Sequence, residues 1–479
     1  MLEKETIMKP NIVLINCDDL GYGDLGCYGS KKNDTPYLDK LAEEGIKFND
    51  FYMASPVCSP SRGAMMTGCY PPRIGFGSFH NEIVLFPGHD IGLNPKEITI
   101  ARVLKDAGYN TMHIGKWHCG DQEDFLPTNH GFDDYYGLPF SNDMARTISN
   151  QDFPPLPLLH GKDVIQQQPD QISLTERYTE KSVEFIRDNQ DNPFFLYLAH
   201  MHVHLPLYAP EYFVKKSRNG DYGACVMAID WSTGVIVEAL KKYGLYENTI
   251  IIFTSDNGSR NDFGESNGIF RGGKRETWEG GLRVPFIVHW KGKIEPSDSD
   301  EIITSLDIYP SLAKISGAEI PQDRIIDGMD LSDLMLGKTK KSKRDTFFYY
   351  LCNCLEAARV GDWKLHVAKP KISRELEDTT REASKIPAPK IDDDIEVKEL
   401  YNLREDPSES NNVYNQYSEI AEMIMEKIEK CRKDIGDAFT DTKGENIRDI
   451  GKVEKANPLT EYDENHPYII SMYDKTEVG

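Results

Sequence analysis

Residues 11–19 read Asn-Ile-Val-Leu-Ile-Asn-Cys-Asp-Asp. Four consecutive apolar residues, three of them β-branched, are typical of a short strand that is buried on both faces. Three other segments, residues 110–114, 194–199 and 249–254, have the same length and character. Because strands of this kind occur mainly in parallel sheets that are covered by helices on both faces, the chain is predicted to have an α/β fold.

Helical patterns lie between these predicted strands. One begins at Thr35-Pro36 and runs to residue 42, and a second covers residues 98–107 and ends at a glycine. A third runs from about residue 222 to 243, with apolar side chains at helical spacing and Gly244 as its stop signal. Alternating strands and helices predict an α/β sandwich around a large, mostly parallel central sheet.

The remainder of the chain has a different character. Residues 347–350, 357–367 and 399–403 are predicted to be strands, and residues 420–435 an amphipathic helix. The polar stretch 370–396 is predicted to be a surface loop. We therefore expect a catalytic α/β domain over residues 1–345 and a smaller subdomain over 346–479, which combines an antiparallel sheet, a helix and an extended tail.

Composition excludes several classes of partner. The chain has 479 residues, with 55 basic and 78 acidic side chains and a net charge of −23, so it should bind neither nucleic acid nor anionic membranes. No apolar run approaches the roughly 18–20 residues that span a bilayer. The N-terminal residues have no signal-peptide core, which predicts a cytoplasmic protein as the sequence stands, or a secreted or periplasmic one if a leader was removed.

Nine cysteines at irregular spacing predict reduced thiols rather than a disulfide framework. Cys352 and Cys354 form an isolated Cys-x-Cys pair, which we interpret as structural rather than as a metal site. The sequence leaves the oligomeric state open.

Polar residues follow each of the four predicted strands. They are Asp18 and Asp19, then Lys116 and His118, then His202 and His204, and finally Asp256 and Asn257. In open α/β sheets, ligands bind beyond the carboxyl ends of the strands. Taken singly, an Asp-Asp pair is often a helix cap, and Asp-Asn-Gly is often a turn. Their occurrence after four separate strands favours a shared site.

A cysteine stands in a distinctive local pattern, Cys58-Ser59-Pro60-Ser61-Arg62. Pro60 favours the first turn of a helix, which residues 61–66 can continue, so Cys58 is predicted to lie at a helix N-terminus. Free amide groups and the helix dipole favour an anion there, and Arg62 could bind the same oxyanion. The alternative is a buried thiol that begins an ordinary helix.

The pentapeptide and its flanks resemble the Cys-x-Pro-x-Arg signature of the type I sulfatase family. Residues 18–24, 115–118, 272–274, 278–281 and 400–403 also match that family, although Cys119 stands where leucine is usual. The resemblance covers roughly residues 10–415. It is closest to the branch that contains arylsulfatase A and N-acetylgalactosamine-6-sulfatase. It implies an alkaline-phosphatase-like sandwich with a mixed, mostly parallel central sheet and a smaller antiparallel sheet in the C-terminal subdomain.

The resemblance also implies a cofactor and a modified residue. A maturation enzyme would oxidise Cys58 to formylglycine, an aldehyde whose hydrate attacks sulfur. A divalent cation, expected to be calcium, would be held by Asp18, Asp19, Asp256 and Asn257. Oxygen ligands, most of them carboxylates, suit such a hard cation.

Four other residues are expected to bind the sulfate group or the hydrate. By the resemblance, Arg62 stabilises the anion of the hydrate, Lys116 and Lys274 bind the sulfate oxygens, and Ser141 adds a hydrogen bond. All four would act on charge that develops around sulfur during the reaction.

Two histidines are expected to move protons. His204 would protonate the departing alcohol, and His118 would take the proton from the second hydroxyl of residue 58, which expels sulfate and restores the aldehyde. His200, His202 and His204 also share one face of an extended strand, so a zinc site is the alternative for them. Pro206 interrupts that strand pattern, which disfavours zinc.

The predicted function is hydrolysis of a sulfate ester to an alcohol and inorganic sulfate. The substrate is expected to be a sulfated carbohydrate, such as a 6-sulfated N-acetylgalactosamine or galactose, with an aryl or steroid sulfate as the alternative. Two other functions stay open: a phosphonate monoester or phosphodiester hydrolase, and an inactive binding protein with unconverted Cys58. We expect the pocket rim to come from residues 76–90, the residues after Ser141 and the C-terminal subdomain.

Overall fold

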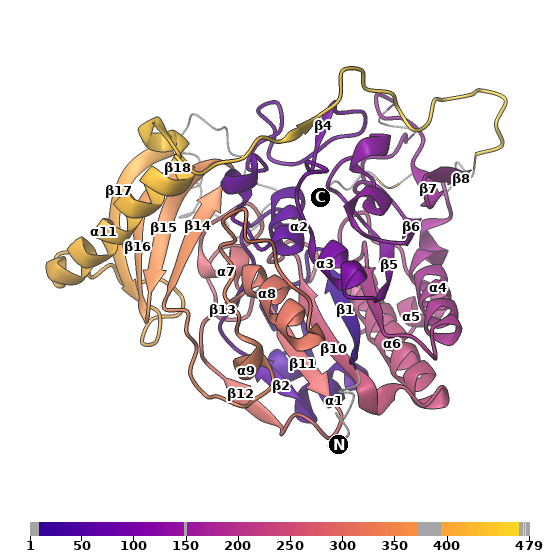
Figure 1. The fold of residues 1–479 in the computed structure, drawn as a ribbon, viewed down its shortest axis with the longest axis horizontal. Helices are drawn as coiled ribbons and strands as arrows, with labels where there is room; N and C mark the ends of the chain where they lie inside the picture. Colours follow the sequence, from indigo (N-terminus) through magenta and orange to yellow (C-terminus); the bar gives the residue numbers. More distant parts are fainter. Residues whose placement is uncertain (1–8, 148–150, 371–393, 469–472, 474, 476–479) are drawn as a thin grey trace, which may run out of the picture.

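The computed structural model describes residues 9–147, 151–370, 394–468, 473 and 475. Its central feature is a ten-stranded sheet within these residues, flanked by helices (Figure 1). In spatial order the strands are β12 (Ser297–Ser299), β2 (Ile46–Phe48), β11 (Phe286–Trp290), β10 (Thr249–Ser255), β1 (Asn11–Cys17), β9 (Phe194–Ala199), β5 (Asn110–Gly115), β6 (Asp134–Gly137), β7 (Pro157–His160) and β8 (Asp163–Gln167).

The middle of this sheet is parallel. Strands β10, β1, β9, β5 and β6 pair in parallel, whereas β11 joins β10, and β7 joins β6, in antiparallel fashion. The four strands predicted from the sequence are the four central ones, and each observed strand agrees with its predicted range to within one residue. The predicted fold class, a mixed and mostly parallel central sheet flanked by helices, is confirmed.

Alternate residues of the central strands pack against opposite layers of helices, as the two-residue period of a strand requires. Ile12 and Leu14 of β1 lie in one core cluster, with side chains from α2 (Cys58–Thr67), α3 (Ile100–Asp106) and α8 (Ser305–Ser316). Val13 and Ile15 lie in the other cluster, with side chains from α1 (Pro36–Glu43), α4 (Leu174–Asp188) and α6 (Gly220–Lys242). The residues of β1 are therefore apolar without interruption because both faces of the strand are buried.

Two of these helices show how local sequence sets their ends. Helix α3 begins two residues later than predicted because Thr99 is its N-cap, with the Thr99 hydroxyl accepting a hydrogen bond from the Arg102 N–H at 3.2 Å. Helix α6 is the one helix among the described residues that is long and apolar enough to cross a membrane, but 78% of its most apolar window is buried inside the protein. We therefore interpret α6 as a core helix.

A second, antiparallel sheet forms the other end of the molecule (Figure 1). It contains β14 (Thr346–Leu351), β15 (Cys354–Val360), β16 (Trp363–Pro370) and β17 (Asp394–Asn402), and α11 (Ser418–Ile435) packs on it. The predicted extended stretch 357–367 is divided between β15 and β16, since Gly361 adopts a positive φ of 56° in the turn between them. Of the predicted loop 370–396, residues 371–393 lie outside the described residues, and the ends belong to β16 and β17.

Short elements complete the described fold. They are β3 (Phe51–Tyr52) paired with β13 (Ile303–Thr304), β18 (Gly436–Asp437) paired with β19 (Thr442–Lys443), and the helices α5 (Glu211–Val214), α7 (Glu279–Leu282) and α9 (Ser332–Met335).

The chain then returns from the second sheet to the α/β part of the molecule. Strand β20 (Gly451–Lys452) pairs with β4 (Ile91–Gly92). Further along, the Asn457 N–H donates to the Gln122 side-chain oxygen at 2.8 Å, and the Thr460 hydroxyl donates to the Pro155 carbonyl at 2.5 Å. Figure 1 shows this segment, coloured yellow, crossing the top of the molecule. We name residues 451–462 the C-terminal strap.

Candidate active site

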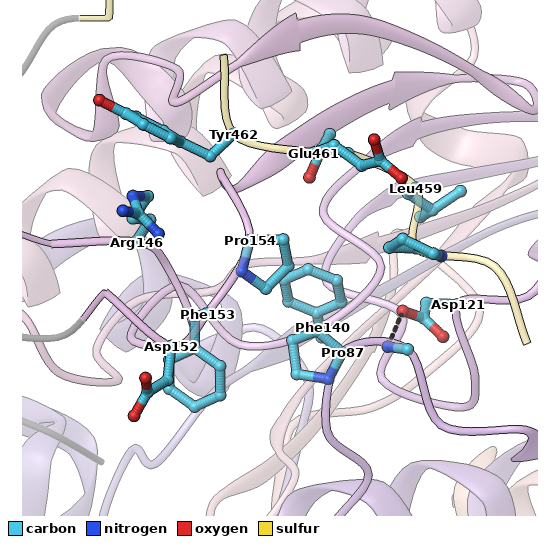
Figure 2. Close-up of a pocket in the computed structure, with 13 residues that line it drawn as sticks. Pro87, Asp121, Phe140, Arg146, Asp152, Phe153, Pro154, Leu459, Glu461 and Tyr462 are labelled. Atoms are coloured by element: carbon cyan, nitrogen blue, oxygen red, sulfur yellow. Dashed lines mark hydrogen bonds between the residues drawn. The ribbon is translucent and has the colours of Figure 1, made fainter. Parts of the chain in front are cut away.

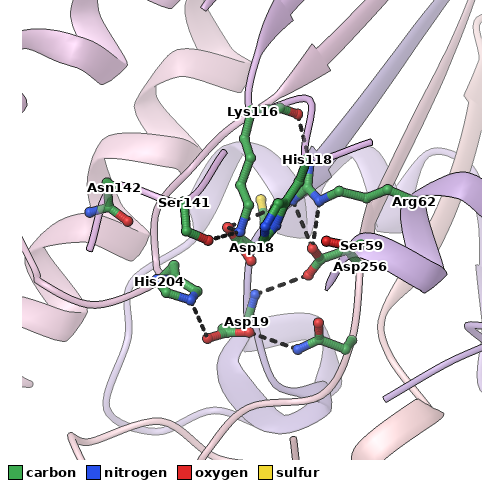
Figure 3. Close-up of polar contacts among 12 residues, drawn as sticks. Asp18, Asp19, Ser59, Arg62, Lys116, His118, Ser141, Asn142, His204 and Asp256 are labelled. Atoms are coloured by element: carbon green, nitrogen blue, oxygen red, sulfur yellow. Dashed lines mark hydrogen bonds and ion pairs between the residues drawn. The ribbon is translucent and has the colours of Figure 1, made fainter. Parts of the chain in front are cut away.

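The residues that follow the central strands meet at one edge of the sheet (Figure 3). Asp18 and Asp19 come directly after β1, and Asp256 and Asn257 directly after β10. Lys116 and His118 follow β5, and His204 lies in the loop after β9. Parallel strands place their carboxyl ends side by side, so the topology brings these side chains together.

Three carboxylates form the centre of the site. Asp18, Asp19 and Asp256 each contribute an oxygen atom, and these atoms all lie within 4.8 Å of one another. Asp19 adopts a positive φ of 62°, and its N–H donates to Asp256 Oδ1 at 3.2 Å. The Asn257 amide donates to Asp19 Oδ1 at 2.7 Å. The backbone is thus turned so that all four side chains face the same point.

This cluster suits a hard divalent cation. Asp18 Oδ1 and Asn257 Oδ1 are buried and have no hydrogen-bond partner, which is costly unless a ligand satisfies them. Burial, together with repulsion by Asp256, raises the pKa of Asp18 to about 6. Burial opposes ionisation of Asp19 as well, but Lys274 and His204 lower its pKa below the usual range. The oxygen atoms available are of the kind that calcium and magnesium bind.

Three cationic side chains balance the three carboxylates. Lys116 Nζ donates to Asp18 Oδ2 and, at 2.6 Å, to the Ser141 hydroxyl. Lys274 Nζ donates to Asp19 Oδ2 at 2.8 Å. Arg62 Nε donates to Asp256 Oδ2 at 2.8 Å, and Arg62 Nη1 donates to the Lys116 carbonyl at 2.8 Å. A divalent cation would therefore give these groups a net positive charge, which favours an anionic substrate.

Cys58 faces this charged cluster. It is the first residue of α2, after Val57 as the N-cap. Its sulfur lies within 4.8 Å of both a carboxylate oxygen of Asp18 and a ring nitrogen of His204. Burial raises the pKa of the Cys58 thiol to about 11, although Lys116 and Lys274 act to lower it. A thiol with this pKa is a poor nucleophile at neutral pH, so the cysteine is well placed but unreactive in its unmodified form.

The two candidate proton carriers have defined tautomers. His118, at a positive φ of 57°, lies 3.0 Å through Nε2 from the Leu85 carbonyl, which can only accept, so Nε2 carries the proton and Nδ1 is the free acceptor. Burial and Lys116 lower the pKa of His118 well below its usual value. His204 Nδ1 lies 2.6 Å from the Leu205 carbonyl and must donate to it, which leaves Nε2 facing Asp19 Oδ2 at 3.8 Å.

The remaining histidines of the predicted strand do not form a metal site. His200 and His202 are both buried. Among the described residues, the groups that lie close enough to share a metal ion are Asp18, Asp19 and Asp256, and Asp18, Cys58 and His204. Neither group includes His200 or His202, so the geometry does not support the zinc alternative. Cys352 and Cys354 belong to neither group and lie at the turn between β14 and β15.

The segment 76–90, which was predicted to form part of the pocket rim, also supports Cys58 and His118 from the side through contacts that the sequence did not predict. The Leu85 N–H donates to the Ser59 hydroxyl at 3.1 Å, and the Leu85 carbonyl accepts from His118. Ser61 also donates through its hydroxyl to the Asp256 carbonyl. No sequence pattern could reveal the Leu85 contacts, since both use backbone atoms of a loop. For the hydrogen bond from Ser61 to Asp256, the only indication in the sequence is that Ser61 lies about one helical turn after Cys58.

Comparison with known proteins identifies relatives of this chain. The Sulfatase family profile matches residues 10–318, and a profile described as the C-terminal region of aryl-sulfatase matches residues 342–450. Human arylsulfatase A is 39% identical over 433 residues, which cover 84% of this chain and 83% of that protein. Mouse N-acetylgalactosamine-6-sulfatase is 38% identical over 377 residues, which cover 75% of this chain and 72% of that protein.

A solved structure gives the same result for the fold. The crystal structure of the PsFucS1 sulfatase from Pseudoalteromonas sp. superposes with a TM-score of 0.79 at 28% sequence identity, covering 93% of this chain and 92% of that one.

Proposed function

The chain belongs to the sulfatase family, and we propose that it hydrolyses the sulfate ester of a carbohydrate through a formylglycine made from Cys58 and a bound calcium ion. As a sulfatase it is an enzyme that converts a sulfate ester and water to an alcohol and inorganic sulfate. The family generally uses formylglycine and a divalent metal. Calcium, the conversion of Cys58 in this chain and the choice of substrate are our proposals.

One observation carries the assignment of Cys58. Its sulfur lies within 4.8 Å of an Asp18 carboxylate oxygen and of a His204 ring nitrogen, at the N-terminus of α2, yet the thiol pKa is raised to about 11. The side chain is thus placed for nucleophilic attack but cannot attack well as a thiol. Formylglycine resolves this conflict, because its hydrate supplies a hydroxyl at the same position.

Asp18, Asp19, Asp256 and Asn257 would hold the calcium ion. Calcium prefers several oxygen ligands, and these side chains offer buried oxygen atoms, of which Asp18 Oδ1 and Asn257 Oδ1 have no hydrogen-bond partner. A bound cation would polarise the sulfate ester and favour the ionised form of the attacking hydroxyl.

The cationic side chains around the cluster bind and orient the sulfate group. Lys116 and Lys274 pair with different carboxylates of the cluster, Lys116 with Asp18 and Lys274 with Asp19. Ser141 is held against Lys116 at 2.6 Å and adds a donor. Arg62 fixes Asp256 and stabilises negative charge on residue 58. These groups are buried, so their charges act in a medium from which water is largely excluded.

His118 has the tautomer that its proton-transfer role needs, whereas His204 needs a second ring proton for its role. His118 presents Nδ1 as an acceptor, because Nε2 donates to the Leu85 carbonyl. It can therefore take a proton from the hydroxyl of residue 58 that remains after attack. His204 presents Nε2 towards the carboxylate cluster, because Nδ1 donates to the Leu205 carbonyl. Because the proton of the neutral ring is on Nδ1, His204 would act as the acid only with a second proton at Nε2, beside Asp19 Oδ2. Burial and Lys274 lower the pKa of His204 to about 3, whereas Asp18 and Asp19 act to raise it. The second proton would be delivered to the departing alcohol.

The proposed substrate is a saccharide that carries a 6-sulfated N-acetylgalactosamine or galactose. The similarity to an N-acetylgalactosamine-6-sulfatase supports this choice. The other proposed partner is a sulfatase-maturing enzyme that acts on Cys58. The net charge of −23 disfavours binding to nucleic acid or to an anionic membrane.

Turnover measurements test the proposal. The protein is produced with a formylglycine-generating enzyme. Release of sulfate from 4-nitrophenyl sulfate, a steroid sulfate, 6-sulfated N-acetylgalactosamine and 6-sulfated galactose is compared with hydrolysis of a phosphodiester and a phosphonate monoester. We expect sulfate esters to be hydrolysed at least about 100-fold faster, and Cys58→Ala to abolish turnover while leaving the fold unchanged. Faster phosphodiester or phosphonate hydrolysis would assign the chain to that chemistry instead. Turnover of aryl or steroid sulfates alone would reject the carbohydrate.

A further inference from the structure

A cavity of about 320 Å³ lies between the α/β part of the molecule and the C-terminal strap (Figure 2). Its walls come from four places in the chain: Pro87 and Gly88, then Asp121, then a group made of Phe140, Arg146, Asp152, Phe153 and Pro154, and finally residues 458–462 of the strap. This volume is at the lower end of the roughly 300–1,000 Å³ typical of small-molecule pockets, which is enough for about one sugar ring.

The cavity is adjacent to the active site, because the same chain segments contribute to both. Phe140 lines the cavity and is followed by Ser141, which binds Lys116. Asp121 lines it three residues after His118, and Pro87 two residues after Leu85. Because an extended chain spans at most about 3.6 Å per residue, the Cα atoms of each of these pairs lie within roughly 11 Å of each other. An occupant of the cavity can therefore be part of a molecule whose sulfate lies beside Cys58.

The walls are mostly apolar and aromatic. Phe140, Phe153, Pro87, Pro154 and Leu459 provide flat or rounded apolar faces, and the Tyr462 ring lies at the rim (Figure 2). Phe153 is held in place by Phe86, with their rings stacked at 6.1 Å and 10°. Rings of this kind suit the C–H faces of a pyranose, which are apolar even though the edges of the sugar carry hydroxyl groups.

The charged groups of the cavity are predominantly acidic. Among the described residues that line it, Asp121, Asp152 and Glu461 are acidic and Arg146 is the one cation. The Arg146 guanidinium lies 4.0 Å over the Tyr462 ring and donates to the Gln151 carbonyl at 2.5 Å, so it is already engaged by the protein. An anionic group placed here would meet an excess of negative charge, whereas hydroxyl groups could donate to the carboxylates.

Fixed contacts hold the acidic wall and the strap in position. Asp121 accepts hydrogen bonds from the Gly88 N–H at 2.6 Å and from the Gln122 amide at 3.0 Å. The strap is attached on both sides of the cavity, through Asn457 to Gln122 and through Thr460 to Pro155. The cavity is therefore a preformed site, for which binding requires little ordering of the protein.

We propose that this cavity binds one uncharged sugar ring linked to the sulfated residue, so that the enzyme selects glycans in which the neighbouring sugar is neutral over those in which it is a hexuronic acid. The inference rests on the proposed function, since it assumes that a sulfated saccharide occupies the adjacent site. It assigns the specificity to Phe153 as the ring-binding residue and to Asp152 and Glu461 as residues that exclude an anion, whereas the Tyr462 ring is already stacked on Tyr468 and covered by Arg146.

Two disaccharides test the proposal. Both carry the same 6-sulfated sugar, which is linked to an uncharged hexose in one and to a hexuronic acid in the other. We expect kcat/KM to be at least about tenfold higher for the neutral disaccharide. The ratio of that kcat/KM to the value for 4-nitrophenyl sulfate should fall at least about tenfold in Phe153→Ala. Tyr212→Ala, at an exposed tyrosine outside the cavity, is the matched control and should leave the ratio unchanged.

A double variant tests whether the acidic residues of the cavity exclude an anionic sugar. Asp152→Asn combined with Glu461→Gln should raise turnover of the hexuronic acid disaccharide relative to the neutral one. Equal turnover of the two disaccharides by the wild type, or an unchanged ratio in Phe153→Ala, would overturn the assignment of the cavity. Turnover of 4-nitrophenyl sulfate separates this result from failure of the proposed function, because that ester has no second sugar. If the wild type hydrolyses the ester but neither disaccharide, the cavity proposal is also rejected.

Discussion

At the scale of single residues, the site shows a conflict between where Cys58 lies and how its thiol behaves. Burial raises its pKa to about 11, and the nearby carboxylates Asp18 and Asp256 add to the effect. Lys116 and Lys274 oppose the shift but do not overcome it. A catalytic thiol normally has a lowered pKa, so the surroundings are unsuited to thiolate chemistry. They suit a hydroxyl that becomes an anion only when a cation and the substrate are bound.

Arg62 provides the first prediction. It spans two groups, with Nε 2.8 Å from Asp256 Oδ2 and Nη1 2.8 Å from the Lys116 carbonyl. A lysine ammonium is a single point of charge and cannot reach both at once. We expect Arg62→Lys to lower kcat for 4-nitrophenyl sulfate by about 100-fold or more, as loss of a preorganised donor does elsewhere. Arg218→Lys, at an exposed arginine paired with Asp34, should change kcat less than twofold, measured in the same assay.

Removal of the metal provides the second prediction. The carboxylates of Asp18, Asp19 and Asp256 are each paired with a cationic side chain, so loss of the bound ion does not leave them uncompensated. We expect chelated protein to stay folded by circular dichroism and to unfold at a somewhat lower temperature, because a ligand of the native state is lost. Sulfate-ester hydrolysis should disappear and return with calcium. Full activity in protein shown to be metal-free by elemental analysis would reject the cation site.

At the scale of secondary-structure elements, a buried carboxylate joins the two sheets. Glu279, the first residue of α7, accepts hydrogen bonds from Tyr52 of β3, Tyr349 of β14 and Lys364 of β16. Arg283 lies 3.3 Å from the same carboxylate. Burial works against ionisation, but Lys364 and Arg283 lower the pKa of Glu279 to about 2. The charge therefore connects the second sheet to the α/β part of the molecule.

Glu279→Gln should lower the free energy of unfolding by about 1.5–3 kcal/mol, because Lys364 and Arg283 lose one charged hydrogen-bond partner, although each keeps a second carboxylate, Glu409 and Asp50 respectively. The pKa of Glu279 is lower in the folded protein than its ordinary value of 4.5, so its stabilising effect is complete above pH 4.5 and is lost as the pH falls towards 2. The difference in unfolding free energy between wild type and variant, measured by urea denaturation, should shrink over that range. Glu211→Gln, at an exposed ion pair with Lys215, should change stability by less than about 0.5 kcal/mol.

Glu279→Gln that is as stable as wild type at pH 7 would show that this carboxylate does not hold the two sheets together. A difference that grows as the pH falls would contradict the sign of the effect.

The same scale shows what the sequence could predict. The strands β1, β9 and β10 are apolar on both faces, and β5 places Met112 and Ile114 on one face and the buried polar residues Thr111 and His113 on the other. The outer strands β2 and β12 have three residues each and include lysine, serine or aspartate, which leaves little periodic signal. The pairing of β20 with β4 involves two residues on each side and depends on tertiary contacts alone.

Some residues of the active site could be predicted from the strand pattern and others could not. Asp18, Asp19, Asp256, Asn257 and Lys116 follow predicted strands, so the parallel topology alone predicted that they would lie together. Lys274 and Ser141 come from loops, and only the family resemblance indicated them. The contacts of Leu85 with Ser59 and His118 use backbone atoms, which carry no residue-specific signal. The C-terminal strap could not be placed, since its low periodicity predicts no regular element.

At the scale of the whole molecule, net charge and site charge have opposite signs. The protein carries a net charge of −23, whereas the active site gathers Arg62, Lys116 and Lys274 around a proposed cation. The overall field should repel a highly sulfated polymer, although the site itself attracts a single sulfate group. Salt screens the long-range part of this field, with a Debye length of about 30 Å at 0.01 M and about 8 Å at 0.15 M.

This balance predicts a salt dependence that differs between substrates. Raising the salt concentration from about 10 to about 150 mM should increase kcat/KM for a polysulfated oligosaccharide several-fold, because repulsion during encounter is screened. The value for 4-nitrophenyl sulfate should change much less, since that ester carries one charge. Initial-rate kinetics on both substrates at matched pH measure the effect. A fall in kcat/KM for the oligosaccharide would show that local attraction dominates its encounter with the enzyme.

The central claim is that catalysis depends on conversion of Cys58 to formylglycine. The most direct measurement is the rate of sulfate-ester hydrolysis across preparations that differ in the converted fraction, which is determined from the mass of the peptide containing residue 58. Conversion removes one sulfur and two hydrogen atoms and adds one oxygen, so the two forms are resolved. The rate of sulfate-ester hydrolysis should be proportional to the converted fraction and should fall to zero when only cysteine is present at residue 58. Substantial hydrolysis by fully unconverted protein would contradict the claim.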